Sequence, residues 1–217
     1  YKSEVSWGDY DNDGDLDILL NGTTSYSGSE YHSKIYKNIG NDSFTELIGM
    51  PFENLGEGSL IWGDYDNDGD LDVFSSGKSG PWQNIIIKSI MYLNEGNDIF
   101  TESEGYYLEN VYNSSIVSAD YDNDGDLDIL LTGLNQSEEP VTILYKNHTF
   151  IQNNPPQTPT NISSEIVAIN ETKLSWNKTT DDNTPQDGLS YNAYIYKVGG
   201  DTVWSSMANI NTGFRKI

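Results

Sequence analysis

Short apolar stretches alternate with polar turns along the first two thirds of the chain. The first stretch covers residues 5–8, the second residues 18–22 and the third residues 35–38, and a fourth begins at Phe44. No segment sustains the 3.6-residue periodicity of an amphipathic helix. Four short strands in a unit of about 50 residues, separated by Gly and Asn turns, are typical of a propeller blade. The pattern therefore predicts an all-β fold made of β-propeller-type blades.

The same unit occurs three times in succession. The matching stretches of the second and third units cover residues 60–63, 73–77, 91–94, 116–119, 129–133 and 144–147. The fourth strand returns at residues 100–102 and, shortened, at residues 149–150. A propeller needs about four to eight blades to close a ring, and residue 1 already falls inside a unit, so we expect the chain to be part of a longer protein. The alternative is an open stack of β-units whose edges are covered by neighbouring protein.

A different pattern begins after residues 153–159, which we interpret as a stiff linker because paired prolines favour extended backbone. Candidate strands follow at residues 173–176, 189–196 and 202–205. They resemble the first half of a fibronectin type III-like sandwich, which needs about 100 residues, with Trp176 as its core tryptophan. We therefore expect a blade region at residues 1–152, the linker, and a partial β-sandwich at residues 160–217.

The net charge is strongly negative, with 34 acidic residues against 11 basic ones and a formal charge of -23. A nucleic-acid-binding surface needs clustered Lys and Arg, and Arg215 is the only arginine in the chain. Attraction to anionic lipids is disfavoured for the same reason, and no run of about 18 apolar residues could span a bilayer. Cysteine is absent, which excludes a disulfide scaffold and a thiolate zinc site.

Most of the negative charge is concentrated in three nine-residue segments, which we call the first, second and third acidic loops (residues 9–17, 64–72 and 120–128). They hold 15 of the 21 aspartates and share one sequence, DYDNDGDLD. Five carboxylates in so short a stretch repel one another unless a cation neutralises them. A solvated, flexible acidic run is the alternative, but repulsion alone gives no reason for three identical copies. The loops are therefore candidate cation sites.

Positions in each acidic loop are numbered 1 to 9 from its first aspartate. A chain that wraps around a hard cation turns positions 1, 3, 5 and 9 inward, while glycine at position 6 permits a sharp turn and position 7 offers its backbone carbonyl. About six or seven oxygen ligands suit Ca²⁺ better than Mg²⁺, and no nitrogen or sulfur ligand for zinc, copper or iron is near. An EF-hand is excluded, because Leu20, Ser75 and Leu131 replace its glutamate at position 12. The candidate ligands of three calcium sites are Asp9, Asp11, Asp13, Asp15, Asp17, Asp64, Asp66, Asp68, Asp70, Asp72, Asp120, Asp122, Asp124, Asp126 and Asp128.

The acidic loops, each taken with the residue before it, resemble the FG-GAP/VCBS-type repeats of integrin α-subunits and many bacterial surface proteins. The resemblance covers roughly residues 1–153. It implies a calcium-binding propeller in which the acidic loop joins the first two strands of a blade. Two features depart from that pattern: only three repeats are present, and Ala119 replaces the glycine found at Gly8 and Gly63.

The chain offers no constellation typical of catalysis. His32 and His148 are isolated, and neither a nucleophile elbow nor a Gly-rich phosphate loop is present. A closed shell of protein oxygens leaves little room for substrate, so we expect structural calcium and no enzymatic activity. The leading hypothesis is a non-catalytic recognition or adhesion module whose calcium ions make the blade loops rigid.

Calcium also bears on localisation and partners. Modular sites with dissociation constants of about 10⁻⁴ to 10⁻³ M fill only where calcium is abundant, which favours a secreted or cell-surface protein. The expected partners are an extracellular protein or glycan ligand and further blades from the parent chain or a neighbouring subunit. Two other functions stay open: an accessory or catalytic propeller of a polysaccharide-degrading enzyme, and a structural spacer.

Overall fold

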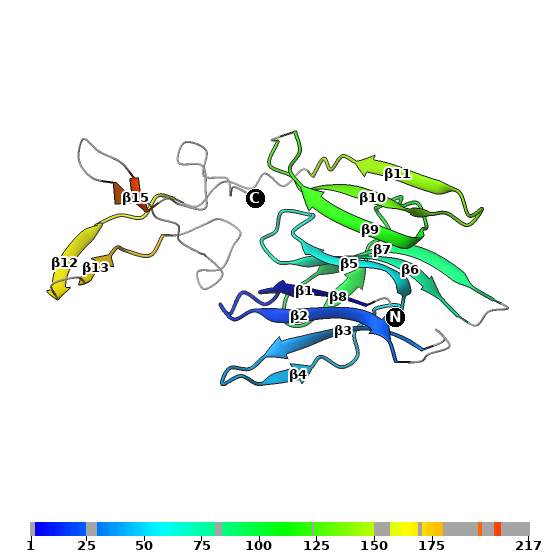
Figure 1. The fold of residues 1–217 in the computed structure, drawn as a ribbon, viewed down its shortest axis with the longest axis horizontal. Coiled ribbons are helices and arrows are strands. Elements are labelled where there is room, and N and C mark those ends of the chain that lie inside the picture. The colour runs from blue at the N-terminus through cyan, green and yellow to red at the C-terminus, as the bar shows by residue number, and fades with distance from the viewer. Residues whose placement is uncertain are drawn as a thin grey trace.

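The structure is a computed structural model that describes residues 3–24, 30–80, 84–122, 124–149, 157–168, 171–179, 195–196 and 202–204. Every regular element in these ranges is a β-strand, which confirms the predicted all-β class (Figure 1). Within the same ranges, no helix is long and apolar enough to cross a membrane.

Three antiparallel sheets coincide with the three repeat units, and we call them blades 1, 2 and 3. Blade 1 has the strand order β1 (Glu4–Gly8), β2 (Asp17–Thr23), β3 (Tyr31–Asn38) and β4 (Phe44–Glu46). Blade 2 has the order β5 (Gly56–Gly63), β6 (Asp72–Ser79), β7 (Ile86–Asn94) and β8 (Phe100–Glu102). Blade 3 contains β9 (Tyr112–Ala119), β10 (Asp128–Leu134) and β11 (Pro140–Tyr145). Its expected fourth strand includes Phe150, which lies outside the described residues.

Local sequence explains both the strands and the turns of a blade. In β3, buried residues alternate with half-buried ones from Tyr31 to Ile35, as expected of a strand with one face in the core. The hairpin from β3 to β4 turns at Asn41 and Asp42, whose φ angles of 52° and 57° are left-handed. Asn and Asp tolerate this region, and two such residues in succession give a turn whose twist matches the flanking strands. Residues 97–98 repeat the turn in blade 2.

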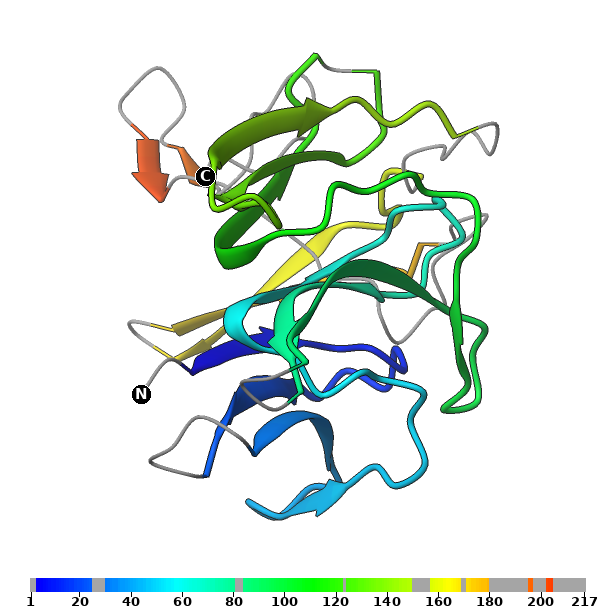
Figure 2. The ribbon, with the colours of Figure 1, turned by 90° about the vertical axis from the view of Figure 1, so that its right-hand side faces the viewer.

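The blades stack in chain order, from blue through cyan to green in Figures 1 and 2. Between blades 1 and 2, blade 1 contributes Tyr10, Leu19 and Ile35. Between blades 2 and 3, blade 2 contributes the equivalent residues Tyr65, Phe74 and Met91. The following blade contributes Leu60 and Trp62 to the first cluster and Ile116 to the second. Full burial stabilises the fold by about 1.5–3 kcal/mol for each large apolar side chain, so these clusters hold the stack together.

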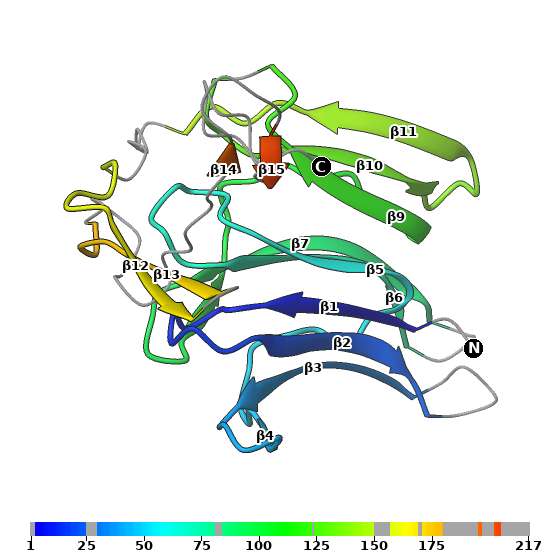
Figure 3. The same cartoon turned by 60° about the vertical axis from the view of Figure 1, so that its left-hand side comes forward.

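Blades 1 and 3 are the outermost blades of the stack (Figure 3), and their outer faces expose different repeat positions to solvent. On blade 3, the exposed fractions of Tyr121, Leu130 and Leu144 are 51%, 39% and 49%. On blade 1, Trp7 is 57% exposed, whereas the equivalent Trp62 of blade 2 is 9% exposed. Within the described residues, burial at these positions therefore follows the presence of an adjacent blade.

Beyond the blades, the structure describes two short strand pairs. β12 (Ser163–Ala168) pairs with β13 (Glu171–Ser175), and β14 (Ile195–Tyr196) pairs with β15 (Thr202–Trp204). The predicted strands at residues 173–176 and 202–205 overlap β13 and β15, while most of the one at residues 189–196 falls outside the described residues. Leu174 and Trp176 are partly exposed, at 39% and 36%. The partial sandwich, its core tryptophan and the domain limits stay predictions.

Candidate metal centres

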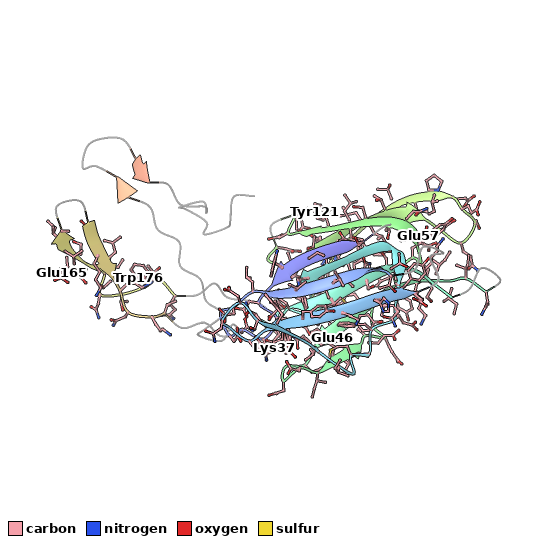
Figure 4. All side chains as sticks on the ribbon, turned by 60° about the horizontal axis from the view of Figure 1, so that its bottom comes forward. Lys37, Glu46, Glu57, Tyr121, Glu165 and Trp176 are labelled. Carbon is pink, nitrogen blue, oxygen red and sulfur yellow. The ribbon has the colours of Figure 1, made fainter. Side chains whose placement is uncertain are left out.

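Each acidic loop joins the first two strands of its blade, where the resemblance to FG-GAP/VCBS-type repeats places it. Antiparallel pairing closes the loops, because Gly8 pairs with Asp17, and the same pairing recurs in blades 2 and 3. The loops lie side by side at one end of the stack. Figure 4 labels Lys37 at this end and Glu57 at the opposite one.

The aspartate at position 1 folds each acidic loop back on itself. In the first loop, Asp9 Oδ1 accepts the backbone N–H of Asp13 at 3.0 Å, and Asp9 Oδ2 accepts that of Gly14 at 3.1 Å. The second and third loops repeat both bonds. The glycine at position 6 has a φ of 94° in the first loop, a left-handed conformation that glycine adopts without steric cost. The sharp turn predicted at position 6 is therefore present.

The aspartate at position 9 is buried in every loop, with an exposed fraction of 0%, 0% and 2% for Asp17, Asp72 and Asp128. Its two oxygens accept two backbone N–H groups. In the second loop, Asp72 Oδ2 accepts from Tyr65 at 2.8 Å, and Asp72 Oδ1 accepts from Asn94, at the end of β7, at 2.9 Å. This carboxylate thus ties the loop to the third strand of its blade. The aspartate spacing alone does not predict that role, although an asparagine recurs in all three units: Asn38 ends β3, Asn94 ends β7, and Asn147 lies two residues after β11.

Carboxylate oxygens converge in all three acidic loops. Three groups have ligand atoms within 4.8 Å of one another: Asp9, Asp11 and Asp13; Asp64, Asp66 and Asp72; and Asp120, Asp122 and Asp128. Positions 1 and 3 belong to every group, position 9 to two of them and position 5 to one. The aspartate side chains at position 7 belong to none of the three. In the second and third loops, Asp70 and Asp126 instead accept hydrogen bonds from the preceding loop.

The donor atoms fit a hard cation. Asp11 Oδ1 and Asp122 Oδ1 are buried and have no hydrogen-bond partner among the described residues. A buried carboxylate oxygen without a partner is costly, and coordination of a cation is one way to satisfy it. The oxygens at positions 1 and 9 each accept one hydrogen bond and keep a free lone pair. A set of carboxylate oxygens is typical of Ca²⁺ and unlike the N and S ligands that zinc and copper prefer.

Two lysines already supply positive charge at the acidic loops. Lys37 forms an ion pair with Asp11 and lies 3.6 Å from Asp98, measured between Nζ and Oδ1. Lys146 of blade 3 pairs with Asp122 in the same way. The equivalent residue in blade 2 is Leu93. The second loop therefore lacks the lysine that the first and third loops share.

Burial opposes ionisation of several loop carboxyls. Desolvation raises the pKa of Asp17 to about 6 and that of Asp72 to about 8, because it outweighs the backbone hydrogen bonds that both groups accept. Burial, together with the nearby charge of Asp68, raises the pKa of Asp64 to about 6. A divalent cation beside these groups would favour their ionised form. The loops therefore combine ligand geometry with a charge imbalance that a cation relieves.

A pocket of about 440 Å³ lies away from the acidic loops. Its lining includes Glu30, His32, Phe52 and Glu53, from both blade 1 and the segment that leads into blade 2. His32 Nε2 lies 3.1 Å from the hydroxyl of Thr24, and Glu53 is ion-paired with Lys88. The pocket is thus polar with one aromatic wall.

Comparison with known protein families identifies an FG-GAP-like repeat at residues 9–75. The match begins with the first acidic loop and ends within β6, so it includes the first and second loops. The third loop has the same nine residues outside the matched range. No curated protein and no solved structure matches the chain. The chain therefore contains an FG-GAP-like repeat, as the sequence predicts, within a β-propeller-type module.

Proposed function

We propose that this chain is a calcium-binding recognition or adhesion module of the integrin α-like FG-GAP/VCBS type, secreted or displayed at a cell surface. The observation that carries the proposal is the convergence of carboxylates around the buried, unpartnered oxygens Asp11 Oδ1 and Asp122 Oδ1. Positions 1, 3, 5 and 9 would hold Ca²⁺ through their side chains and position 7 through its backbone carbonyl. Bound calcium would supply positive charge and fix the loops, with no chemical step.

The residues of the loop do the positioning in this mechanism. Position 1 closes the turn through the N–H groups of positions 5 and 6. Position 9 accepts the backbone N–H of position 2 in its own loop and, in the second loop, that of Asn94 at the end of β7. Because these bonds hold the ligands near one another, less conformational entropy is lost when a cation binds. Modular sites of about 10⁻⁴ to 10⁻³ M affinity fill at extracellular calcium levels, which supports the proposed localisation.

The proposed partners are an extracellular protein or glycan ligand and further blades from the parent chain or a neighbouring subunit. Further blades are supported by the exposed apolar residues Tyr121, Leu130 and Leu144 on blade 3, because the equivalent residues of blades 1 and 2 are buried by the next blade. The polar pocket beside Phe52 favours the alternative of a carbohydrate-active propeller, since an aromatic wall and carboxylates suit a sugar ligand. Arrays of glycans and matrix proteins, with hydrolysis assays on polysaccharides, separate a binder, an enzyme and a spacer.

Calcium titration tests the proposal directly. Isothermal calorimetry should give three sites, and Asp11→Asn or Asp122→Asn should each remove or weaken one. Asp42→Asn, in the β3–β4 turn, is the matched control and should leave three sites. Calcium at about 100 times the dissociation constant should stabilise the fold by about 2.7 kcal/mol per site. The absence of both heat and a change in melting temperature at about 10 mM calcium would overturn the proposal.

A further inference from the structure

A continuous chain of hydrogen bonds joins the three acidic loops. Each step uses the aspartate at position 9, the tyrosine at position 2 and the asparagine that ends the next blade's third strand or lies two residues after it. Asp17 accepts the N–H of Tyr10, and the Tyr10 carbonyl accepts Asn94 Nδ2 at 2.9 Å. Asn94 N–H then donates to Asp72, which also accepts from Tyr65. One blade further on, Asn147 Nδ2 donates to the Tyr65 carbonyl at 2.7 Å, and its N–H donates to Asp128.

The chain of hydrogen bonds is buried for most of its length. Tyr10, Asp17, Asp72 and Asn94 each have an exposed fraction of 3% or less. Hydrogen bonds in such surroundings are strong, and a member that loses its partner cannot turn to water. A displacement of Asp72 therefore changes the surroundings of Tyr10 in the first loop.

A second link connects the same loops nearer the surface. Asn12 Nδ2 of the first loop donates to Asp70 Oδ1 of the second at 2.8 Å, and Asn67 Nδ2 of the second donates to Asp126 Oδ1 of the third at 2.8 Å. Asn12 and Asn67 have φ angles of 57° and 61°, so position 4 takes up a left-handed conformation when it reaches the next loop. The link therefore depends on the ordered shape of both loops.

We propose that the three calcium sites form one cooperative unit, in which filling one acidic loop raises the calcium affinity of its neighbour. The inference rests on the proposed function and extends it. A calcium ion that orders one loop fixes a tyrosine carbonyl and an asparagine side chain that the neighbouring site also needs. Binding of the second ion then orders fewer groups and loses less conformational entropy. This gives positive coupling between the two sites without a large change of shape. Coupling of this kind changes affinity by about 5- to 150-fold.

The asparagines that end β3 and β7 provide a matched pair of variants. Asn38 Nδ2 donates to the Leu16 carbonyl of its own blade at 3.2 Å, and Asn94 Nδ2 makes the same bond to Leu71 at 3.2 Å. Asn94 alone of the two also reaches the preceding loop, through the Tyr10 carbonyl. Asn94→Ala therefore removes the link between loops as well as the bonds within the blade, to the Leu71 carbonyl and from the Gly96 N–H. Asn38→Ala removes only bonds within its own blade, to the Leu16 carbonyl and from the Gly40 N–H.

Calcium titration of the unmodified chain should give a Hill coefficient above one, with chelated protein as the starting state. Asn94→Ala should lower the Hill coefficient and weaken the first site about fivefold or more, while Asn38→Ala should keep the cooperativity. Circular dichroism of each variant checks that it is folded. If Asn94→Ala does not fold, Asn12→Ala tests the surface link in the same way.

Three independent sites, or equal cooperativity in Asn94→Ala, Asn12→Ala and Asn38→Ala, would overturn the inference while leaving calcium binding intact. No calcium binding to the unmodified chain would instead overturn the proposed function. Amide hydrogen exchange gives a second readout, because calcium at one loop should slow exchange of the neighbouring loop only while the link is present.

Discussion

The indole ring of Trp62 lies parallel to the phenol ring of Tyr10, with 2° between the ring planes and 5.9 Å between the centroids. Tyr10 is position 2 of the first acidic loop, and Trp62 belongs to β5 of the next blade. Gly8 makes room for this contact, because a Cβ atom there would lie 2.6 Å from Trp62 Cδ1. The core between two blades and the backbone of a candidate metal loop therefore meet at one residue.

Trp62→Ala should lower the free energy of unfolding by about 3–5 kcal/mol, because it leaves a cavity between blades 1 and 2. It should also weaken calcium binding at the first loop, whose Tyr10 loses its stacking partner. Urea denaturation and calcium titration measure the two effects. Trp7→Ala is the matched control at the equivalent, exposed position of blade 1, and its effect should stay within about 1 kcal/mol. Equal losses in the two variants would contradict the role given to the core between the blades.

Ile35→Ala should destabilise the fold by about 2–5 kcal/mol, whereas Leu144→Ala should cost less than about 1 kcal/mol. Both residues occupy one repeat position, but Ile35 is fully buried against blade 2 and Leu144 is 49% exposed on blade 3. Urea denaturation of the two variants at equal protein concentration measures the difference. A cost at Leu144 as large as that at Ile35 would mean that another surface covers blade 3 in solution.

Lys37→Leu should raise the calcium affinity of the first loop by roughly fivefold, the equivalent of about 1 kcal/mol. The ammonium group pairs with Asp11 and so competes with a cation for the same carboxylate. Leucine is the residue that blade 2 carries at this position. Lys34→Leu is the control, because Lys34 pairs with Glu46 at 2.8 Å, away from the loop. Calorimetry that finds weaker binding in Lys37→Leu than in Lys34→Leu would refute this competition.

The metal-free protein should lose stability as the pH rises from about 4 to about 8. Burial raises the pKa of Asp17 to about 6 and of Asp72 to about 8, from an ordinary value of 3.8. A carboxyl with a raised pKa in the folded state holds its proton more tightly there. Its stabilising contribution is therefore complete below its unfolded pKa and is lost as the pH rises through its folded pKa.

Melting temperatures in chelator should fall across this pH range, and saturating calcium should remove the fall, because the cation favours the ionised carboxylates. The comparison of chelator with calcium at each pH is the internal control. A melting temperature in chelator that rises with pH would contradict the burial of these groups in the metal-free state.

The local pattern of the chain was enough to predict the strands of the blades, the sharp turn at position 6 and loop residues that converge, whereas β12 was not predicted. Each of these depends on neighbours within a few positions: short apolar stretches for strands, glycine and asparagine for turns, and a repeated aspartate spacing for the cluster. The structure places positions 1 and 3 together in all three loops, as the spacing predicts.

Contacts between distant segments could not be predicted in this way. Tyr10 and Tyr121 share position 2 of identical loops, yet their exposed fractions are 1% and 51%, because a following blade covers only the first within the described residues. The bond from Asn12 to Asp70 joins residues 58 positions apart. No pattern within one loop indicates that its position 4 bonds to the loop of the next blade.

The packing of the blades also gives the stack a polarity. In both contacts between blades, the face of one blade that carries Tyr10 or Tyr65 packs against the face of the next blade that carries Leu60 or Ile116. The two faces that meet are therefore always different surfaces of the blade. Such a heterologous contact does not pair a surface with itself around a two-fold axis, and it extends in one sense only. A further blade that repeats this contact at either outer face must therefore dock in one orientation, head to tail.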